Sequence, residues 1–458
     1  MTGWRGRLTM LVAAVFASVL AGAAAAQDVA GEWHGTLANA TAELRLGLEI
    51  TAKPGGGYEG RMISPDQSPA WLPLDNITLQ GGRLVIAGSR VAGRFEGQWD
   101  AEHQAWVGQW TQGYVMPLVL LKGKIEPRLR PQTPKPPFPY RAEDVSFDSA
   151  PGVRLAGTLT LPQGKGPFPA AILLNGSGPQ DRDESFMGHK AFMLLADALT
   201  RRGVAVLRTD DRGFGKSTGD FNAATGTDFV ADAEAALAYL RGRREIEGKR
   251  IGLIGHSEGG IIAPLVAVAD PQVAFVALLG APGVTSRELL AAQREAVGRT
   301  AGLPPEAVAA NEITWGRLEK ALADAKDLAQ GQADAAKVLV ETGMPADTAN
   351  ATVRQIASPW YKWFIAYDPR PTLAKLGAPV LAMNGDKDVQ VLAKQNLPAI
   401  REALKANPDV TIVEWPGLNH LFQTADTGAP VEYARIEETM APAALDTLTG
   451  WVETRAKR

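Results

Sequence analysis

The chain has 458 residues and a formal net charge of −3, with 45% hydrophobic and 21% charged residues. At roughly 100–200 residues per domain, this length and composition predict a globular protein of about two to four domains. The near-neutral charge lacks the basic excess typical of nucleic-acid-binding proteins. The absence of cysteine excludes disulfide bonds, thiolate metal sites, iron–sulfur clusters and a cysteine nucleophile.

The first 26 residues are typical of a secretory signal peptide. Arg5 and Arg7 form a basic start, residues 8–22 are apolar, and residues 24–26 are alanines that precede Gln27. This order of charge, apolar run and small residues is the pattern at which signal peptides are cleaved. A retained membrane anchor is the alternative, but the end of the run is mostly alanine and weakly hydrophobic. We expect a periplasmic or secreted protein of a Gram-negative bacterium, with no stable membrane insertion after cleavage.

Residues 28–125 predict a small all-β domain. Alternating apolar and polar positions, as in residues 44–50 and 83–86, are separated by glycine-rich turns at 54–57 and 81–82. Short strands between regular turns indicate a small antiparallel β-sandwich or barrel. The domain contains four tryptophans of interest, Trp33, Trp99, Trp106 and Trp110. They could line a binding face, but we favour the interpretation that they form the core of this domain.

Residues 144–458 predict an α/β domain. A proline-rich linker at 126–143, expected to be stiff and extended, separates it from the β-domain. After a hairpin at 145–161, apolar runs typical of buried strands alternate with segments of helical spacing. This alternation predicts a mostly parallel sheet with helices on both faces and an active site at the carboxyl ends of its strands. The expected strands are 170–174, 204–207, 251–254, 273–279, 379–383 and 410–413, and the expected helices are 192–201, 229–241, 261–269 and 397–404.

One expected strand, 251–254, leads into Gly255-His256-Ser257-Glu258-Gly259 and then into an apolar helix. Gly-x-Ser-x-Gly between a strand and a helix is typical of a nucleophile elbow, a strained turn that projects a serine hydroxyl into the cleft. The glycines let strand and helix approach closely, and the helix N-terminus supplies positive potential. We therefore expect Ser257 to be a catalytic nucleophile.

A serine nucleophile needs a base and an acid, which follow it along the chain in this kind of fold. Of the five histidines, only His420 follows Ser257, so His420 is the expected base and His256 is interpreted as structural. Asp386 and Asp388 both follow the strand at 379–383 and both qualify as the acid. The pattern Gly-x-x-Asp-x-x-Val favours Asp388, which would orient His420 and stabilise its imidazolium.

Backbone N–H groups should form an oxyanion hole for the reaction. One donor is expected from Glu258, directly after the nucleophile, and the other from Gly176 or Ser177 in a loop of small residues. The sequence leaves the choice between these two open. The charged residues 180–184 either are solvated or brace this loop by pairing with one of two arginines, Arg208 or Arg212.

The segment at about 285–375 is much longer than an ordinary crossover between strands. Its content of alanine, glutamate and lysine predicts helices, and helices at this place would form a lid that walls the pocket and excludes water. An aromatic cluster near its end either lines an acyl pocket or docks the lid onto the core: Trp360, Trp363, Phe364 and Tyr367.

Residues 145–455 resemble the α/β hydrolases, specifically bacterial serine esterases with a prolyl-oligopeptidase- or dienelactone-hydrolase-like domain. The motifs that carry the resemblance occur in the family's order, at 175–184, 210–217, 255–260, 385–391 and 419–420. The resemblance implies hydrolysis of esters, or less often of thioesters and amides, without a cofactor. One departure is Asn175, where many relatives carry histidine before glycine.

The sequence therefore predicts a secreted serine carboxylesterase that acts on small-molecule esters through an acyl-enzyme. A serine peptidase or amidase, or a thioesterase or acyltransferase, of the same fold is the alternative. A non-catalytic binding protein is disfavoured because nucleophile, acid and base are all present. Residues 215–217 resemble the end of a P-loop, but that motif needs glycine where Asp210 stands, and five scattered histidines predict no zinc site. Acyl length, alcohol group and oligomeric state do not follow from the sequence.

Overall fold

The computed structural model describes residues 29–38, 43–66, 70–126 and 128–457. The expected signal peptide lies outside the described residues. The chain forms two compact units that divide near Glu126. Over the described ranges, no helix combines the length and the apolar character that crossing a membrane would require.

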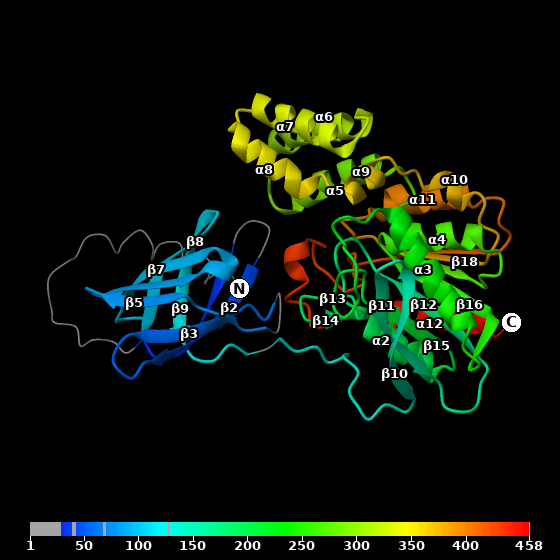
Figure 1. The fold of residues 1–458 in the computed structure, drawn as a ribbon, viewed down its shortest axis with the longest axis horizontal. Helices are drawn as coiled ribbons and strands as arrows, with labels where there is room; N and C mark the ends of the chain where they lie inside the picture. The colour runs from blue at the N-terminus through cyan, green and yellow to red at the C-terminus, as the bar shows by residue number, and fades with distance from the viewer. Residues whose placement is uncertain (1–28, 39–42, 67–69, 127, 458) are drawn as a thin grey trace. The chain divides into compact units, whose positions relative to one another are not determined.

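The first unit is one antiparallel sheet with the strand order β4-β3-β2-β1-β9-β8-β7-β6-β5. Because β3 also contacts β5, the sheet curls toward a barrel (Figure 1). Trp33, Trp106 and Trp110 are at most 2% exposed in its interior, which confirms the interpretation of these tryptophans as core residues. The strands are β1 (Gly31–Ala38), β2 (Glu43–Ala52), β3 (Tyr58–Ile63), β4 (Leu72–Pro73), β5 (Asn76–Gln80), β6 (Arg83–Gly88), β7 (Gly93–Asp100), β8 (Ala105–Gln112) and β9 (Tyr114–Lys122).

The second unit has a mostly parallel sheet with the order β10-β11-β15-β12-β16-β17-β18-β19. β11 pairs antiparallel with both β10 and β15, and all pairs from β15 to β19 are parallel. The domain has the α/β-hydrolase fold. Its strands are β10 (Arg141–Ala150), β11 (Val153–Leu161), β12 (Phe168–Leu174), β15 (Ala205–Thr209), β16 (Ile246–His256), β17 (Val276–Leu279), β18 (Val380–Gly385) and β19 (Val410–Trp415), and a small hairpin, β13 (Ser185–Phe186) with β14 (His189–Lys190), follows β12.

Helices cover both faces of this sheet, as the apolar runs of its central strands require. On one face, α3 (Gly226–Arg241), α4 (Gly259–Ala269) and α11 (Ala393–Ala403) contribute to one apolar core. On the other face, α2 (Ala191–Arg201) and α12 (Pro442–Ala456) form a second core. Every expected strand and helix is present with shifted ends. For example, the expected strand 273–279 begins only at Val276 because Pro271 and the residues after it form a turn.

The expected helical insertion lies between β17 and β18. Its helices are α5 (Ser286–Thr300), α6 (Pro305–Asp324), α7 (Leu328–Glu341), α8 (Ala346–Ile356), α9 (Pro359–Ile365) and the short α10 (Arg370–Leu373). Their starts follow helix-capping rules, since Thr285 and Glu288 form a capping box and Ser358 caps α9 ahead of Pro359. Figure 1 shows α5 to α8 gathered as one group beyond the sheet. They share a small apolar core of their own, which includes Leu318, Leu322 and Leu339.

Candidate active site

Ser257 occupies the sharp turn between β16 and α4. Its φ angle of +51° lies in the left-handed region, which a non-glycine residue adopts at a cost and most often at functional sites. A methyl group on Gly255 would lie 2.0 Å from the carbonyl oxygen of Gly259, and one on Gly259 would lie 2.2 Å from that of Leu174. Both flanking glycines are therefore required by close backbone contacts, which explains the Gly-x-Ser-x-Gly sequence.

Asp388 and His420 come together at the carboxyl ends of β18 and β19. The Nδ1 of His420 lies 2.7 Å from Oδ2 of Asp388, and both side chains are almost completely buried. The other oxygen, Oδ1, accepts backbone N–H groups of Gln390 and Val391 at 2.8 Å each. These bonds orient the carboxylate, and the carboxylate in turn leaves Nε2 of His420 as the nitrogen that can exchange protons.

The alternative acid, Asp386, has a different role. Its Oδ1 accepts the backbone N–H of Gly417 at 2.7 Å, so it fastens the loop before His420. The geometry therefore favours Asp388 as the partner of His420. Within the described residues, the hydroxyl of Ser257 makes no hydrogen bond to His420, and catalytic hydrogen bonds are often long without substrate.

His256 links these segments, which the sequence analysis did not anticipate. Its ring lies 4.7 Å from the ring of His420, centroid to centroid, and its Nε2 donates to the carbonyl oxygen of His420 at 3.1 Å. Its Nδ1 lies 2.8 Å from Oε1 of Glu184. The same oxygen of Glu184 accepts the N–H of Gly176, also at 2.8 Å. One buried carboxylate thus connects the loop after β12 with the nucleophile turn.

The expected oxyanion donors lie beside Ser257. Glu258 stands at the N-cap of α4, and in the described part of the chain its N–H has no acceptor. A methyl group on Gly176 would lie 3.3 Å from Cβ of Ser257, so this loop directly adjoins the nucleophile. The N–H of Gly176 is occupied by Glu184, whereas that of Ser177 meets no acceptor among the residues described. This difference favours Ser177 as the second donor.

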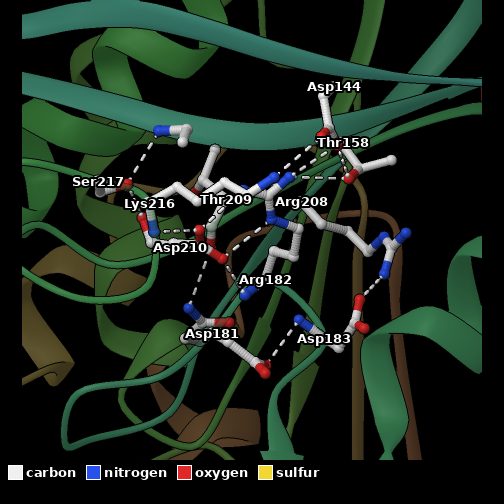
Figure 2. Close-up of polar contacts among 12 residues, drawn as sticks. Asp144, Thr158, Asp181, Arg182, Asp183, Arg208, Thr209, Asp210, Lys216 and Ser217 are labelled. Atoms are coloured by element: carbon white, nitrogen blue, oxygen red, sulfur yellow. Dashed lines mark hydrogen bonds and ion pairs between the residues drawn. The ribbon is translucent and has the colours of Figure 1, made fainter.

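The charged residues after this loop brace it. Arg182 donates to both carboxylate oxygens of Asp210, at 2.9 and 2.8 Å (Figure 2), a bidentate arrangement that fixes geometry as well as charge. Asp183 pairs with Arg208. Arg212 instead pairs with two aspartates of α3. Of the two arginines weighed from the sequence, Arg208 is therefore the one that holds the loop.

A cavity opens beside the nucleophile turn, with Asn175, Gly176, Asp211, Phe229, Glu258 and Ile262 among its lining residues. Burial raises the pKa of Glu258 to about 7, and a hydrogen bond from the Trp360 indole opposes this rise. Burial also raises the pKa of Asp211 to about 8. Across the described residues neither carboxyl group forms an ion pair, so the cavity wall carries two acids without a cationic partner.

The aromatic cluster of the insertion docks α9 onto the rest of the domain. Trp360 donates its indole N–H to Glu258 and stacks on Phe364 at 5.0 Å. Trp363 stacks on Tyr367 at 5.1 Å and covers Gly226 at the start of α3. None of these four rings belongs to the lining of the cavity. Of the four, Trp360 contacts the site, through its hydrogen bond to Glu258.

Residues 189–424 match the protein family described as serine aminopeptidase, S33. The match covers 236 of the 458 residues. The chain belongs to this family. Membership in the S33 family agrees with the strand order and with the Gly-x-Ser-x-Gly turn, and it makes the chain a hydrolase of the α/β fold.

Curated relatives of this S33 member include esterase EstD of Thermotoga maritima, 26% identical over 300 residues, which are 65% of this chain and 64% of that protein. The chain thus spans less than two thirds of the length of EstD. Human dipeptidyl peptidase 8 is 31% identical over 150 residues, 31% of this chain and 16% of that one. Among solved structures, the Pyrococcus furiosus esterase PF2001 matches at a TM-score of 0.42 and 16% identity, over 70% of this chain and 91% of that one.

Proposed function

We propose that the protein is a secreted serine hydrolase that cleaves carboxylic esters of small molecules through an acyl-enzyme intermediate. The observation that carries the proposal is the buried hydrogen bond between Asp388 and His420, close to a serine held in a left-handed turn. A similarity to a protein named as an esterase supports the choice of esters. The basic and apolar N-terminal residues, 1–26, support export to the periplasm or beyond.

The proposed reaction has two halves. The Oγ of Ser257 attacks the ester carbonyl while Nε2 of His420 accepts the hydroxyl proton, and Asp388 stabilises the imidazolium that forms. The N–H groups of Glu258 and Ser177 bind the oxyanion. His420 then protonates the leaving alcohol, which leaves the acyl group on Ser257. In the second half, His420 takes a proton from water, the hydroxide attacks the acyl group, and the carboxylic acid leaves as His420 returns the proton to Ser257.

The test is covalent labelling of the purified protein with a fluorophosphonate, read by mass spectrometry, beside a panel of p-nitrophenyl esters from acetate to palmitate. We expect a label on Ser257 and an optimum of acyl length. Ser257→Ala should lose the label and at least about 10³-fold of the rate, whereas Ser146→Ala, a surface serine on β10, serves as the matched control. A wild-type protein that accepts no label would contradict the proposal.

A second candidate is a peptidase or amidase that binds a free amine. The observation in its favour is the pair of carboxyl groups, Asp211 and Glu258, that line the cavity beside Ser257 without an ion pair in the described region. Burial disfavours the ionised form of these carboxyl groups, and a cationic amine bound between them would favour it again. Rapid turnover of aminoacyl anilides, lost on N-acetylation of the same compounds and in Asp211→Asn, would favour this candidate over the esterase.

A further inference from the structure

We infer that Glu184 and His256 form a buried ion pair whose role is to position the oxyanion loop and the His420 loop around Ser257. Both are positioning residues and neither touches the reacting atoms. The inference rests on the proposed serine hydrolase function and extends it to two residues outside the triad.

The hydrogen-bond pattern sets the charge of His256. Its Nδ1 lies 2.8 Å from a carboxylate oxygen of Glu184, and its Nε2 lies 3.1 Å from the carbonyl oxygen of His420. Both partners only accept hydrogen bonds when Glu184 is ionised, so both ring nitrogens must carry protons to satisfy them. A neutral ring has a single N–H and would leave one contact unmade. His256 is therefore an imidazolium in this arrangement.

The groups around His256 support the charged ring. Burial works against the charge, but the pKa of His256 is raised overall by the negative charge and hydrogen bond of Glu184, by the hydrogen bond to the His420 carbonyl and by the charge of Asp388. A further titratable neighbour is His420, whose ring packs on that of His256. Asp211 is also close enough to Glu184 for the charge of Glu184 to contribute to its raised pKa.

The ion pair joins three catalytic segments that are distant in sequence. Glu184 binds the N–H of Gly176 in the oxyanion loop, His256 belongs to the nucleophile turn, and the carbonyl of His420 belongs to the loop that carries the base. Occupying the N–H of Gly176 leaves the next amide, that of Ser177, for the oxyanion. A displacement of about 1 Å in such groups can cost about 10²-fold in rate, so the pair controls catalysis without contacting the substrate.

The experiment compares Glu184→Gln, His256→Gln and the double variant with the wild type on one p-nitrophenyl ester. We expect each single variant to lower kcat by about 10- to 100-fold, with KM changed by less than about threefold. The double variant should be no slower than the worse single variant, because residues that act as a unit are not additive. Glu319→Gln is the matched control: it breaks a buried ion pair with Arg294 inside the helical insertion and should lower stability while kcat stays within about twofold.

A pH profile separates positioning from a merely structural role. As the pH rises through the pKa of His256, the ring loses a proton and one of its two hydrogen bonds, so kcat of the wild type should fall on the alkaline side. Glu184→Gln removes the charge that raises this pKa, so the fall should begin at lower pH. On the folded wild type, ¹⁵N NMR should show two protonated nitrogens on His256 near neutral pH, assigned by their loss in His256→Gln among only five histidines.

Single variants with wild-type kcat, or a double variant as slow as the product of the two single effects, would overturn the inference. So would a neutral His256 ring in the spectrum, which needs no variant to be active. Fluorophosphonate labelling of the wild type keeps the two ideas apart. If the wild type is labelled and the variants are unaffected, the positioning inference fails alone, whereas an unlabelled wild type refutes the proposed function itself.

Discussion

Glu258 offers a test of the electrostatics of the cavity through protein stability. The residue is 5% exposed, and burial raises the pKa of its carboxyl group from 4.5 to about 7. The shift of about 2.5 units corresponds to about 3 kcal/mol of differential stability between the neutral and charged forms. We therefore expect Glu258→Gln, which keeps the shape and removes the titration, to alter how stability depends on pH.

The direction follows from proton binding. Between pH 4.5 and 7 the unfolded chain releases the Glu258 proton while the folded protein retains it, so the folded protein binds more protons and loses stability as the pH rises. The loss of stability is complete once the pH is well above the pKa of Glu258 in the folded protein, about 7. Glu258→Gln should thus match the wild type near pH 4.5 and exceed it in unfolding free energy by about 3 kcal/mol at pH 8.

Urea unfolding at several pH values, followed by circular dichroism at 222 nm, measures this difference. The helical signal reports the second unit, because the described part of the first unit contains no α-helix. Trp360→Phe removes the hydrogen bond that stabilises the charged carboxylate, so the stability loss should extend to higher pH and become larger. In contrast, Glu319→Gln, which disturbs a buried acid paired with Arg294, should destabilise at all these pH values. An offset between Glu258→Gln and wild type that stays constant from pH 5 to pH 8 would refute the reasoning.

Three further predictions concern other parts of the framework. Gly259→Ala places a methyl group 2.2 Å from the carbonyl oxygen of Leu174, so it should destabilise by about 1–3 kcal/mol or more, seen as a lower Tm; an unchanged Tm would contradict the contact. Arg182→Met leaves Asp210 buried without its bidentate partner and should cost about 3–5 kcal/mol in urea unfolding, whereas Lys216→Ala, at an exposed pair, should cost less than about 1 kcal/mol. Burial lowers the pKa of His189 to about 4, so stability should fall as the pH drops from 6.5 toward 4, and His189→Gln should abolish this acid-side slope.

The sequence predicted the fold because its signals were local and repeated. The buried strands of the sheet appear in the sequence as apolar runs, and the helices between them as amphipathic segments. The order of the elements was therefore predicted correctly even where their ends differ. His420 could be predicted because a single histidine follows Ser257. Asp388 was favoured over Asp386 by spacing, and the structure supplies the physical distinction: one carboxylate faces the histidine, and the other holds a loop amide.

The ion pair of Glu184 with His256 could not be predicted, because its partners are 72 residues apart and neither has a local pattern. Two signals could have suggested it: a histidine directly before the nucleophile and an acid at the end of the charged run at 180–184. The pairing of β12 with β16 brings the segments that carry them side by side. Likewise, the composition of the insertion predicted helices, but the contact of Trp360 with Glu258 depends on how those helices pack.

Because of where the helical insertion lies, its length and sequence can change without a matching change in the stability of the sheet. The chain leaves the sheet at β17 and returns at β18, which are adjacent strands in parallel register from Val276 with Val380 to Leu279 with Met383. Because the sheet itself holds both strands, the segment between them can be shortened, lengthened or exchanged at a small entropic cost. We therefore expect that a grafted segment that preserves the contact at Glu258 would leave the stability of the sheet beneath it unchanged.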